Sequence, residues 1–316
     1  MSALPFETVS KNIIVRKKST GSFGNNPCER PVETLLRYGI VNIDKPAGPT
    51  SHNVAAYVQK ILEIDKTGHS GTLDPAVTGC LPVALGKATR VNEALLSAGK
   101  EYVCVMHIHA DLPEQEIREG LNKFVGKIRQ IPPKKSAVKR EEREREIYYI
   151  DVMEIKERDV LFRIGCEAGT YIRKICHDFG EKMGCGAHMR ELRRTKAGPF
   201  NEESMCTLYE LKDAYVLWKE KKTDKELKKL ILPVEKAVGH LPKVWIMDSA
   251  IKPVSHGRSI YADQISKFED CIKKNDRIAV FSLKDELVAL GNSYLDSDDM
   301  LKKDKAVAVN IDKVFL

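Results

Sequence analysis

GHSGTLDP at residues 68–75 contains one conspicuous carboxylate, Asp74, and TGCLP follows at residues 78–82. Asp74 precedes Pro75, and a proline drives the residue before it out of the helical region toward extended backbone angles. The glycines and prolines on both sides favour a shaped loop over a helix or a strand. The side chain of Asp74 is therefore predicted to be held on a stiff loop, although a turn-forming aspartate is the commoner explanation for Asp-Pro taken by itself.

Periodic patterns on both sides of this loop predict a mixture of strands and helices. Strands are expected at residues 38–44, 100–109 and 160–166, and a helix at residues 50–62. Thr50 and Ser51 suit the start of that helix, because their hydroxyls can accept a bond from a free backbone N–H. A second helix is expected to be capped by Thr170 and ended by Gly184. Strands and helices do not alternate regularly, so the predicted fold class is α+β with a mixed sheet.

The pattern changes near residue 242. Residues 219–230 are rich in Lys and Glu and are expected to form a solvated helix or a linker. Short strand-like runs separated by turn residues follow at 244–247, 277–282, 287–291 and 306–311. We therefore predict a domain of residues 38–242, a small β-rich domain of residues 243–316 and an extension of residues 1–37. The local sequence does not decide whether the extension is disordered or lies against another part of the chain.

Composition narrows the class of protein. Lys and Arg number 52 against 45 for Asp and Glu, and the net charge of +7 supports a nucleic-acid partner only weakly. The eight cysteines have neither C-x-x-C nor zinc-ligand spacing, which predicts reduced thiols, an intracellular compartment and no metal site. No apolar run approaches the ~18 residues of a membrane span. Neither a P-loop nor a dinucleotide-binding glycine pattern is present, so no nucleotide cofactor is expected.

Three further side chains could act with Asp74. Tyr102 begins a predicted strand and could carry a proton or stack on a base, or be an ordinary half-buried tyrosine. Arg173 lies in the first turn of the second helix, where a cation is unfavourable for the helix dipole. It either pairs with a carboxylate elsewhere or lies on the surface. His69 could be an acid, a base or a stacking ring, although a loop histidine is more often polar surface.

Two basic clusters are candidates for phosphate binding. One lies between Gly186 and Gly198 and consists of Arg190, Arg193, Arg194 and Lys196. The other lies between Lys134 and Arg145 and includes Lys134, Lys135, Lys139 and Arg140. Glutamates alternate with the basic residues of the second cluster, so a salt-bridged surface helix is the alternative prediction there.

Short motifs occur in a fixed order: DKPAGPTS at 44–51, GHSGTLDP at 68–75, GKEY at 99–102 and GTYIR at 169–173. In this order they resemble the pseudouridine synthases that include dyskerin, its archaeal counterparts and the bacterial tRNA pseudouridine-55 synthase. Further segments resemble the dyskerin branch: SAVKR at 136–140, GAHMRELRRT at 186–195 and HLPKVWI at 240–246. The resemblance implies a mixed-sheet catalytic domain, a small β-barrel PUA domain that binds RNA, and an N-terminal extension packed on that PUA domain.

The resemblance also implies a role for each matching residue. Asp74 would be the catalytic carboxylate, Tyr102 would stack on the target base and help to move its proton, and Arg173 would pair with Asp74. In the substrate pocket, Leu192 would line the uracil site, and His69 would help to hold the RNA with its nucleotide flipped out. Lys45 and Pro46 would brace the floor of the active site. In the PUA domain, His256 and Gly257 match the usual RNA-binding pattern.

Such an enzyme isomerises uridine to pseudouridine, and the chemistry requires no cofactor. The bond between ribose C1′ and uracil N1 breaks, the ring turns, and C5 bonds to C1′, so nothing is oxidised and nothing is added. The carboxylate acts as a nucleophile at the sugar or the base, or it takes the C2′ proton, and the sequence does not choose among these. A paired or stacked uridine has to be flipped out to reach such a site.

In the dyskerin branch a box H/ACA guide RNA selects the target uridine. The resemblance therefore implies guide RNA, rRNA or tRNA substrate, small accessory proteins and a kink-turn-binding ribosomal-type protein as partners. A stand-alone tRNA pseudouridine-55 synthase and an inactive RNA-binding scaffold are the alternatives. The sequence ends at Leu316 without the long Lys/Glu-rich tail of eukaryotic dyskerins, which favours a cytoplasmic archaeal protein over a nucleolar eukaryotic one.

Overall fold

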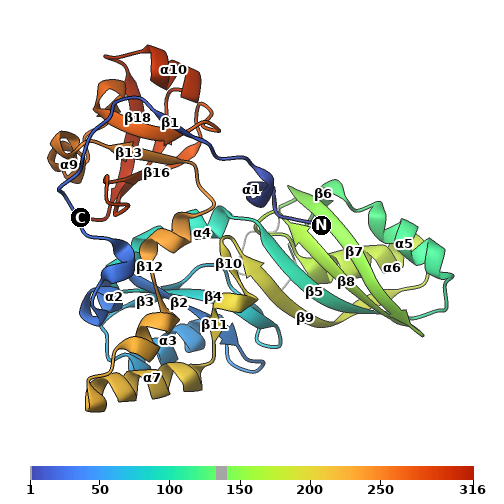
Figure 1. Ribbon diagram of the computed structural model, residues 1–316. Coiled ribbons are helices and arrows are strands. Elements are labelled where there is room, and N and C mark those ends of the chain that lie inside the picture. Colours follow the sequence, from blue (N-terminus) through green and yellow to red (C-terminus); the bar gives the residue numbers. More distant parts are fainter. Residues whose placement is uncertain (1, 133–140) are drawn as a thin grey trace.

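The computed structural model describes residues 2–132 and 141–316, which fold around two β-sheets (Figure 1). The smaller sheet, orange and red except for one blue strand at its edge, lies above the larger one in this view. The larger sheet contains both antiparallel and parallel strand pairs, so the predicted α+β class with a mixed sheet is confirmed. Within the described residues, no helix has the length and apolar character that crossing a lipid bilayer requires.

The larger sheet has the strand order β11-β2-β4-β9-β5-β8-β7-β6 in the described part of the chain, with β3, β10 and β12 beside it. Its strands are β2 (Gly39–Lys45), β3 (Thr67–His69), β4 (Thr78–Leu85), β5 (Lys100–Ile108), β6 (Gly126–Gln130), β7 (Arg143–Lys156), β8 (Asp159–Cys166), β9 (Ala187–Ala197), β10 (Phe200–Asn201), β11 (Met205–Cys206) and β12 (Ile231–Pro233). The predicted strands at 38–44, 100–109 and 160–166 correspond to β2, β5 and β8.

Helices cover this sheet, and hydrophobic cores fill the space between them. They are α2 (Val32–Tyr38), α3 (Ser51–Ile61), α4 (Asn92–Ser97), α5 (Glu114–Asn122), α6 (Ile172–Met183), α7 (Leu208–Lys221) and α8 (Lys225–Leu230). Short 3-10 turns are η1 (Pro27–Glu29), η2 (Gly86–Val91), η3 (Glu202–Ser204) and η4 (Val234–Val238). Residues 219–230, predicted as a solvated helix or linker, form the end of α7, the connection at residues 222–224 and all of α8.

The smaller sheet has the order β1-β15-β13-β16-β17-β18-β14. Its elements are β1 (Ile13–Val15), β13 (Lys243–Ile246), α9 (Asp248–Ser255), β14 (Ile260–Tyr261), η5 (Ala262–Gln264), β15 (Ile265–Glu269), β16 (Arg277–Phe281), β17 (Leu287–Ser293), α10 (Ser297–Lys302) and β18 (Val307–Val314). The strand-like runs predicted after residue 242 correspond to β13, β16, β17 and β18.

Helix caps agree with prediction at α3 and differ at α6. The side chain of Thr50 accepts a backbone N–H bond of 3.1 Å at the start of α3, as predicted. The prediction that Thr170 caps α6 is wrong: the cap residue is Tyr171, and the Thr170 hydroxyl donates to the carbonyl of Glu167 at 2.7 Å. Gly184 ends α6 with a φ of 67°, as predicted for a residue in the left-handed region.

The described end of the second basic cluster is not helical: residues 143–145 begin β7, which pairs with β6, so the alternative prediction of a salt-bridged helix is wrong for these residues. Opposite charges face each other across the two strands: Lys127 pairs with Glu144 at 2.8 Å, and Arg129 pairs with Glu142 at 3.7 Å. Alternating charges suit this cross-strand pairing as well as they suit a helix. Four of the predicted RNA-binding residues lie outside the described residues: Lys134, Lys135, Lys139 and Arg140.

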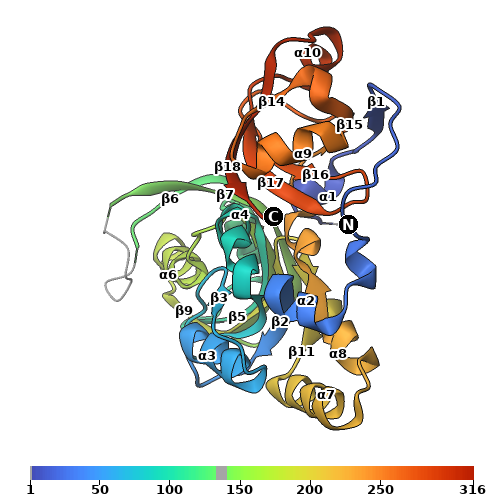
Figure 2. The ribbon, with the colours of Figure 1, turned by 90° about the vertical axis from the view of Figure 1, so that its left-hand side faces the viewer.

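The N-terminal extension contacts both sheets. Strand β1 pairs antiparallel with β15 of the smaller sheet. The short helix α1 (Pro5–Thr8) lies against the larger sheet, where Glu7 binds Lys196 of β9 at 2.9 Å. In Figures 1 and 2 the blue chain runs across the smaller sheet to α1. Residues 2–15 therefore link the two sheets.

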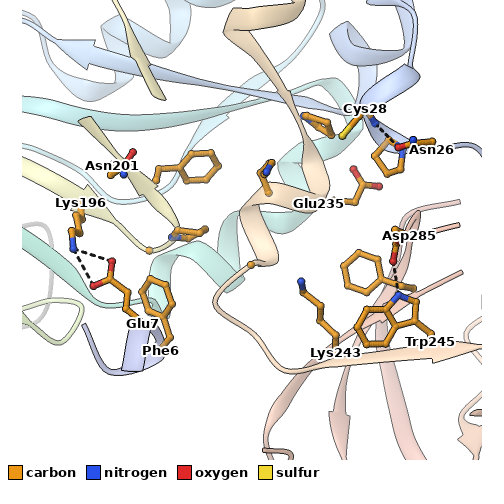
Figure 3. Close-up of a pocket in the computed structure, with 18 residues that line it drawn as sticks. Phe6, Glu7, Asn26, Cys28, Lys196, Asn201, Glu235, Lys243, Trp245 and Asp285 are labelled. Carbon is orange, nitrogen blue, oxygen red and sulfur yellow. Dashed lines mark hydrogen bonds and ion pairs between the residues drawn. The ribbon is translucent and has the colours of Figure 1, made fainter. Parts of the chain in front are cut away.

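Arg30 strengthens the junction between the sheets. Its guanidinium is 6% exposed, and it makes two bonds of 2.9 Å to Glu235 and one of 3.0 Å to Glu286. A cavity of about 480 Å³ lies at this junction, with Lys196 of the larger sheet and Trp245 of the smaller sheet on its wall (Figure 3). One hydrophobic core contains residues of both sheets, so the two parts pack directly against each other.

Candidate active site

Asp74 lies on the loop between β3 and β4. Gly71 and Gly79 in this segment have φ angles of 97° and 100°, which residues with a Cβ rarely adopt. A Cβ at Gly79 would also lie 2.2 Å from the carbonyl oxygen of Arg194, because β4 and β9 approach closely here. Conformation and space both require glycine at residue 79, and the loop is thereby held against β9. The predicted loop is confirmed for residues 70–77, but the prediction is wrong for residues 68–69, which end β3, and for residues 78–82, which begin β4.

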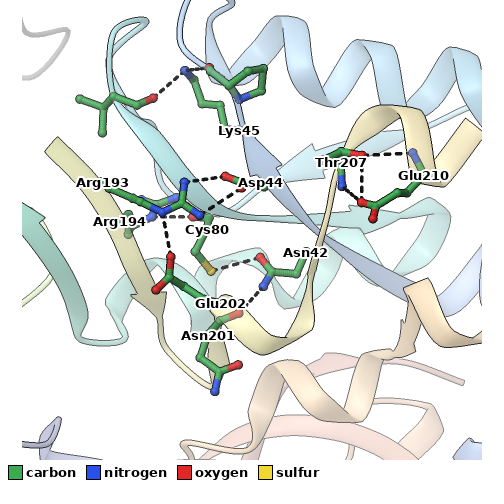
Figure 4. Close-up of polar contacts among 12 residues, drawn as sticks. Asn42, Asp44, Lys45, Cys80, Arg193, Arg194, Asn201, Glu202, Thr207 and Glu210 are labelled. Carbon is green, nitrogen blue, oxygen red and sulfur yellow. Dashed lines mark hydrogen bonds and ion pairs between the residues drawn. The ribbon is translucent and has the colours of Figure 1, made fainter. Parts of the chain in front are cut away.

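Lys45 supports this loop from the end of β2. Its side chain is 0% exposed, and its ammonium donates to the carbonyl oxygens of Pro46, Pro75 and Val77 at 2.8–2.9 Å (Figure 4). Burial, together with the Arg194 guanidinium, lowers the pKa of Lys45, whereas three carbonyl acceptors favour its charged form. Lys45 thus contacts the Asp74 loop directly, and Pro46 takes part through its carbonyl oxygen.

Asp74 and Arg173 form an ion pair. Arg173 comes from the first turn of α6, where the helix dipole disfavours a cation, and Asp74 supplies the carboxylate partner that this position predicted. The two side chains are 52% and 47% exposed respectively, so a ligand can reach the pair. Exposed pairs add little to stability. The chemical effect of this one is to orient the carboxylate and to favour its ionised form.

The ion pair borders a cavity of about 430 Å³ enclosed by the Asp74 loop, β5, β9 and the segment before α6. Tyr102 on β5 and Leu192 on β9 line the same cavity. Four predicted site residues from separate parts of the chain therefore meet at one place: Asp74, Tyr102, Arg173 and Leu192. The volume lies within the range of sites that bind small ligands.

Tyr102 is half-buried on the cavity wall. Burial raises the pKa of its phenol, an effect that the Arg194 guanidinium partly opposes. The phenol is therefore protonated at neutral pH. A protonated tyrosine at this position can donate a hydrogen bond, and its ring provides a surface on which a base can stack.

Arg194 occupies a different position from the one predicted. Its side chain is 1% exposed, Nε donates to the carbonyl of Cys80 at 2.7 Å, and Nη2 donates to the carbonyl of Gly71 at 3.1 Å. A guanidinium buried in this way cannot take up a phosphate on the protein surface, so the predicted role in phosphate binding is corrected. Arg194 instead lines the cavity and holds the Asp74 loop.

Lys100 is a site residue that the sequence reasoning missed. Its ammonium is 4% exposed and donates to three carbonyl oxygens at 2.7–3.0 Å. Burial and the Arg194 guanidinium lower the pKa of Lys100 to about 7. The nearby Cys166 thiol and His240 imidazole are neutral at that pH, because burial raises the pKa of Cys166 to about 12 and lowers that of His240 to about 4. Strand alternation was the available signal, since it places Lys100 and Tyr102 on one face of β5.

Two other basic residues of β9 are ion-paired. Arg193 makes bonds of 2.9 and 3.0 Å to the two oxygens of Asp44 and one of 2.7 Å to Glu202 (Figure 4). The hydrogen bonds that Arg193 donates to Asp44, and then the one to Glu202, raise the pKa of Arg193. Arg190 binds Asp159 at 2.6 Å and is 56% exposed. Contact of either arginine with RNA stays a prediction, because a phosphate would have to share each guanidinium with these carboxylates.

The two histidines predicted to contact RNA differ in exposure. His69 on β3 is half-buried and is not among the residues that line the cavity; its Nδ1 has no hydrogen-bond partner in the described part of the chain. Burial, with the Arg194 guanidinium and His52, lowers the pKa of His69. His256 is exposed just after α9, where its Nδ1 contacts a backbone carbonyl at 2.8 Å, and Gly257 follows with a φ of 80°. Their contacts with RNA stay predictions.

Family models match most of the chain. The model described as "TruB family pseudouridylate synthase (N terminal domain)" matches residues 59–172, and "tRNA pseudouridylate synthase B C-terminal domain" matches residues 173–239. "PUA domain" matches residues 242–315, and "DKCLD (NUC011) domain" matches residues 2–55. These matches confirm the resemblance to pseudouridine synthases that carry a PUA domain.

Curated relatives and solved structures agree. The "Probable tRNA pseudouridine synthase B" of Pyrococcus furiosus is 51% identical over 98% of this chain and 92% of its own length; that of Thermococcus kodakarensis is 52% identical over the same shares. A chain of the "Crystal Structure of a Cbf5-Nop10-Gar1 Complex" is 50% identical, with a TM-score of 0.95 over 100% of this chain and 97% of that one. A chain of the "Structure of H/ACA RNP bound to a substrate RNA containing 2'-deoxyuridine" is 48% identical, with a TM-score of 0.92 over 99% and 97%. With an aspartate, its arginine partner and a tyrosine assembled in one cavity on this fold, the chain belongs to the TruB family of pseudouridine synthases.

Proposed function

We propose that the chain isomerises uridine to pseudouridine under the direction of a box H/ACA guide RNA, as the catalytic subunit of a ribonucleoprotein. The observation that carries the chemistry is the cavity where Asp74, Arg173 and Tyr102 meet. The match to chains of the Cbf5-Nop10-Gar1 complex and of the substrate-bound H/ACA RNP over nearly their whole length supports the guided mode. The partners are then guide RNA, rRNA or tRNA substrate, small accessory proteins and a kink-turn-binding ribosomal-type protein.

Asp74 supplies an ionised carboxylate to the sugar or the base of a flipped-out uridine. It acts as a nucleophile or takes the C2′ proton, and both actions require the ionised form that Arg173 favours. Tyr102 stacks on the base and moves its proton, and Leu192 packs against the uracil. Flipping the nucleotide out is costly. Contacts between basic side chains and RNA phosphates offset that cost.

The remaining predicted residues serve RNA binding in this scheme. Residues 38–242 form the catalytic domain, and residues 243–316 form the PUA domain, which grips the guide at His256 and Gly257. The extension of residues 1–37 packs on the PUA domain. His69 helps to hold the RNA while the nucleotide is flipped out. The residues assigned to RNA phosphates are Arg190, Arg193, Lys134, Lys135, Lys139 and Arg140. Because the relatives are archaeal, we place the protein in the cytoplasm of an archaeal cell.

The chain reconstituted with guide RNA and accessory proteins tests this function. Pseudouridines would be mapped in rRNA fragments with and without guide, for the wild type and for Asp74→Asn. The variant should bind RNA as the wild type does and yield no pseudouridine, because an amide is neither a nucleophile nor a base here. Asp298→Asn, on the exposed face of α10, is the matched control and should retain full turnover. Turnover by Asp74→Asn near the wild-type rate would contradict the assignment.

A stand-alone tRNA pseudouridine-55 synthase is a second candidate, which the names of the curated relatives favour. The same protein incubated with tRNA alone, without guide or accessory proteins, separates the two modes. Product in tRNA alone supports the stand-alone mode, product that depends on the guide supports the guided mode, and both results together mean that one site serves both.

A further inference from the structure

The cavity beside Asp74 carries an excess of buried positive charge. The charged residues that line it are Asp74, Lys100, Arg173 and Arg194. Arg173 and Asp74 neutralise each other as an ion pair, which leaves Arg194 and the protonated form of Lys100 unbalanced. Lys45, fully buried behind the loop, adds a third. The wall of the cavity is therefore cationic even though a carboxylate stands at its rim.

Backbone carbonyls, rather than carboxylates, hold these buried cations. Lys45 and Lys100 each donate to three carbonyl oxygens, and Arg194 donates to two. Within residues 2–132 and 141–316, none of the three has a carboxylate within the 4.0 Å of an ion pair. Removing a charge from water without a counter-ion is costly. Stability alone therefore does not account for three such groups in one place.

The cations converge beneath the Asp74 loop. A Cβ built on Gly71 would lie 3.3 Å from Nη1 of Arg194 and 3.9 Å from Cε of Lys100. Arg194 is also the direct cross-strand partner of Tyr102. A fixed charge in surroundings of low dielectric acts more strongly than one in water. The positive field of this cluster is thus directed at the space where a uracil would lie.

The reaction creates a negative charge in that space. When the C1′–N1 bond breaks, its electron pair stays on the base and spreads over N1, O2 and O4, while C1′ becomes electron-poor. After the ring turns, C5 supplies the electron pair of the new C1′–C5 bond. The proton that then leaves C5 balances the one that N1 takes up. Between the two steps, the enzyme has to stabilise a uracil anion.

We infer that Lys100 and Arg194 form an electrostatic floor that stabilises the uracil anion expelled from C1′, with Lys45 as the cation behind it. Charges that are already in place when charge develops need no reorganisation, which makes them effective in the transition state. No proton transfer from Lys100 is involved, because three carbonyl oxygens occupy its donors. The inference deepens the proposed function and rests on the chemistry assigned to this cavity.

Changing the leaving group tests the inference. Single-turnover cleavage of the original C1′–N1 bond would be measured by mass spectrometry of digested RNA, with uridine or 5-fluorouridine at the target. Fluorine withdraws electrons, so the fluorinated base leaves more easily and needs less help. Lys100→Met should lose about 10- to 100-fold in rate with uridine but less than about threefold with 5-fluorouridine. Lys100→Arg, which retains the charge, should keep the wild-type ratio of the two rates.

Two further variants separate electrostatics from structure. Lys100→Gln is neutral but still donates to carbonyl oxygens, so it should show the same substrate dependence as Lys100→Met. Lys196 lies on the same strand as Arg194 but is ion-paired to Glu7 outside this cavity. The control variant Lys196→Met should therefore alter both rates by the same factor. Equal losses with both substrates in the two neutral Lys100 variants would overturn the inference, since a structural or phosphate-binding role predicts that result.

A binding measurement on the wild type keeps the inference testable if the variants do not fold. A short RNA with a base-free ribose at the target leaves the cavity open to added uracil or barbiturate, a similar planar ring that is anionic at neutral pH. The wild type should bind barbiturate at least about tenfold more tightly than uracil, and equal affinities would overturn the inference. This measurement needs neither turnover nor a guide. The binding result therefore stays separate from two other outcomes: absence of guided turnover, and retention of activity by Asp74→Asn.

Discussion

Leu4 is the anchor that fastens the N-terminal extension to the larger sheet. Its side chain is 0% exposed, and its Cδ2 lies 3.4 Å from the position that a Cβ on Gly99 would occupy. Glu7 closes the short helix α1 by accepting the Leu4 backbone N–H at 2.7 Å, and it also binds Lys196. Replacing Leu4 by alanine should therefore release residues 2–8 from the sheet while β1 stays paired with β15.

The expected size of the effect follows from burial. Leu→Ala substitutions at fully buried sites cost about 2–5 kcal/mol, because transfer free energy is lost and a cavity remains. Helix α1 has four residues, too few to be stable by itself. The Glu7–Lys196 pair is partly exposed, and such pairs contribute about 0–1 kcal/mol. The open form of residues 2–8 should thus become about 30- to 4,000-fold more populated in Leu4→Ala.

Native-state hydrogen exchange measures this opening at two protected amides. The N–H of Leu4 donates to the Glu7 carboxylate, and the N–H of Glu7 donates to the Leu4 carbonyl at 2.9 Å. Both should exchange faster by the factor above, while amides of β15 keep their wild-type protection. Val9→Ala is the matched control, because Val9 is 46% exposed. Equal exchange in the two variants would refute the view that Leu4 anchors the extension.

Buried charges and close backbone contacts also have consequences for pH dependence and stability. In a pH profile of kcat/KM, activity should fall as the pH rises through about 7, where Lys100 loses its proton and the thiol and imidazole facing it stay neutral; Lys100→Arg should hold its activity to higher pH. Arg30→Met should lower the free energy of unfolding in urea by about 3 kcal/mol, because it leaves two weakly exposed carboxylates unpaired. Gly79→Ala should lose far more turnover than Gly48→Ala: both positions have positive φ, but a Cβ meets a backbone oxygen only at Gly79, and equal losses would refute the steric argument.

Local sequence patterns predicted the elements around the site, because those elements depend on near neighbours in the chain. Alternating side chains at residues 100–109 indicate β5, and Thr50 marks the start of α3. The meeting of Asp74 with Arg173 is of another kind, since it depends on which strands pair and where α6 packs. Local sequence left an ordinary turn and a surface arginine as alternatives. The resemblance to known motifs predicted that Asp74 and Arg173 meet, which periodicity could not predict.

Strand β9 shows why part of the basic cluster was misinterpreted. Arg193 and Arg194 are identical neighbours in the sequence, but a strand directs successive side chains to opposite faces. Arg193 reaches Asp44, and Arg194 lies in the interior against the carbonyl of Cys80. Sequence patterns locate the inner face of a strand from its apolar residues. Where the inward residue is itself charged, the pattern wrongly predicts that it lies on the surface. Lys100 was missed for the same reason.

The bonds that hold two of the three buried cations, Lys45 and Arg194, also build the loop on which Asp74 stands. Lys45 binds the carbonyls that follow Asp74, and Arg194 binds the carbonyl of Gly71 before it. A scaffold needs only N–H donors at these places, and neutral amides would supply donors at a lower desolvation cost. Charge at all three positions therefore implies a function that neutral donors lack. Stabilising the electron pair that leaves C1′ with the uracil is such a function. If scaffolding were the whole role of these side chains, Lys100→Gln would turn over uridine at the wild-type rate.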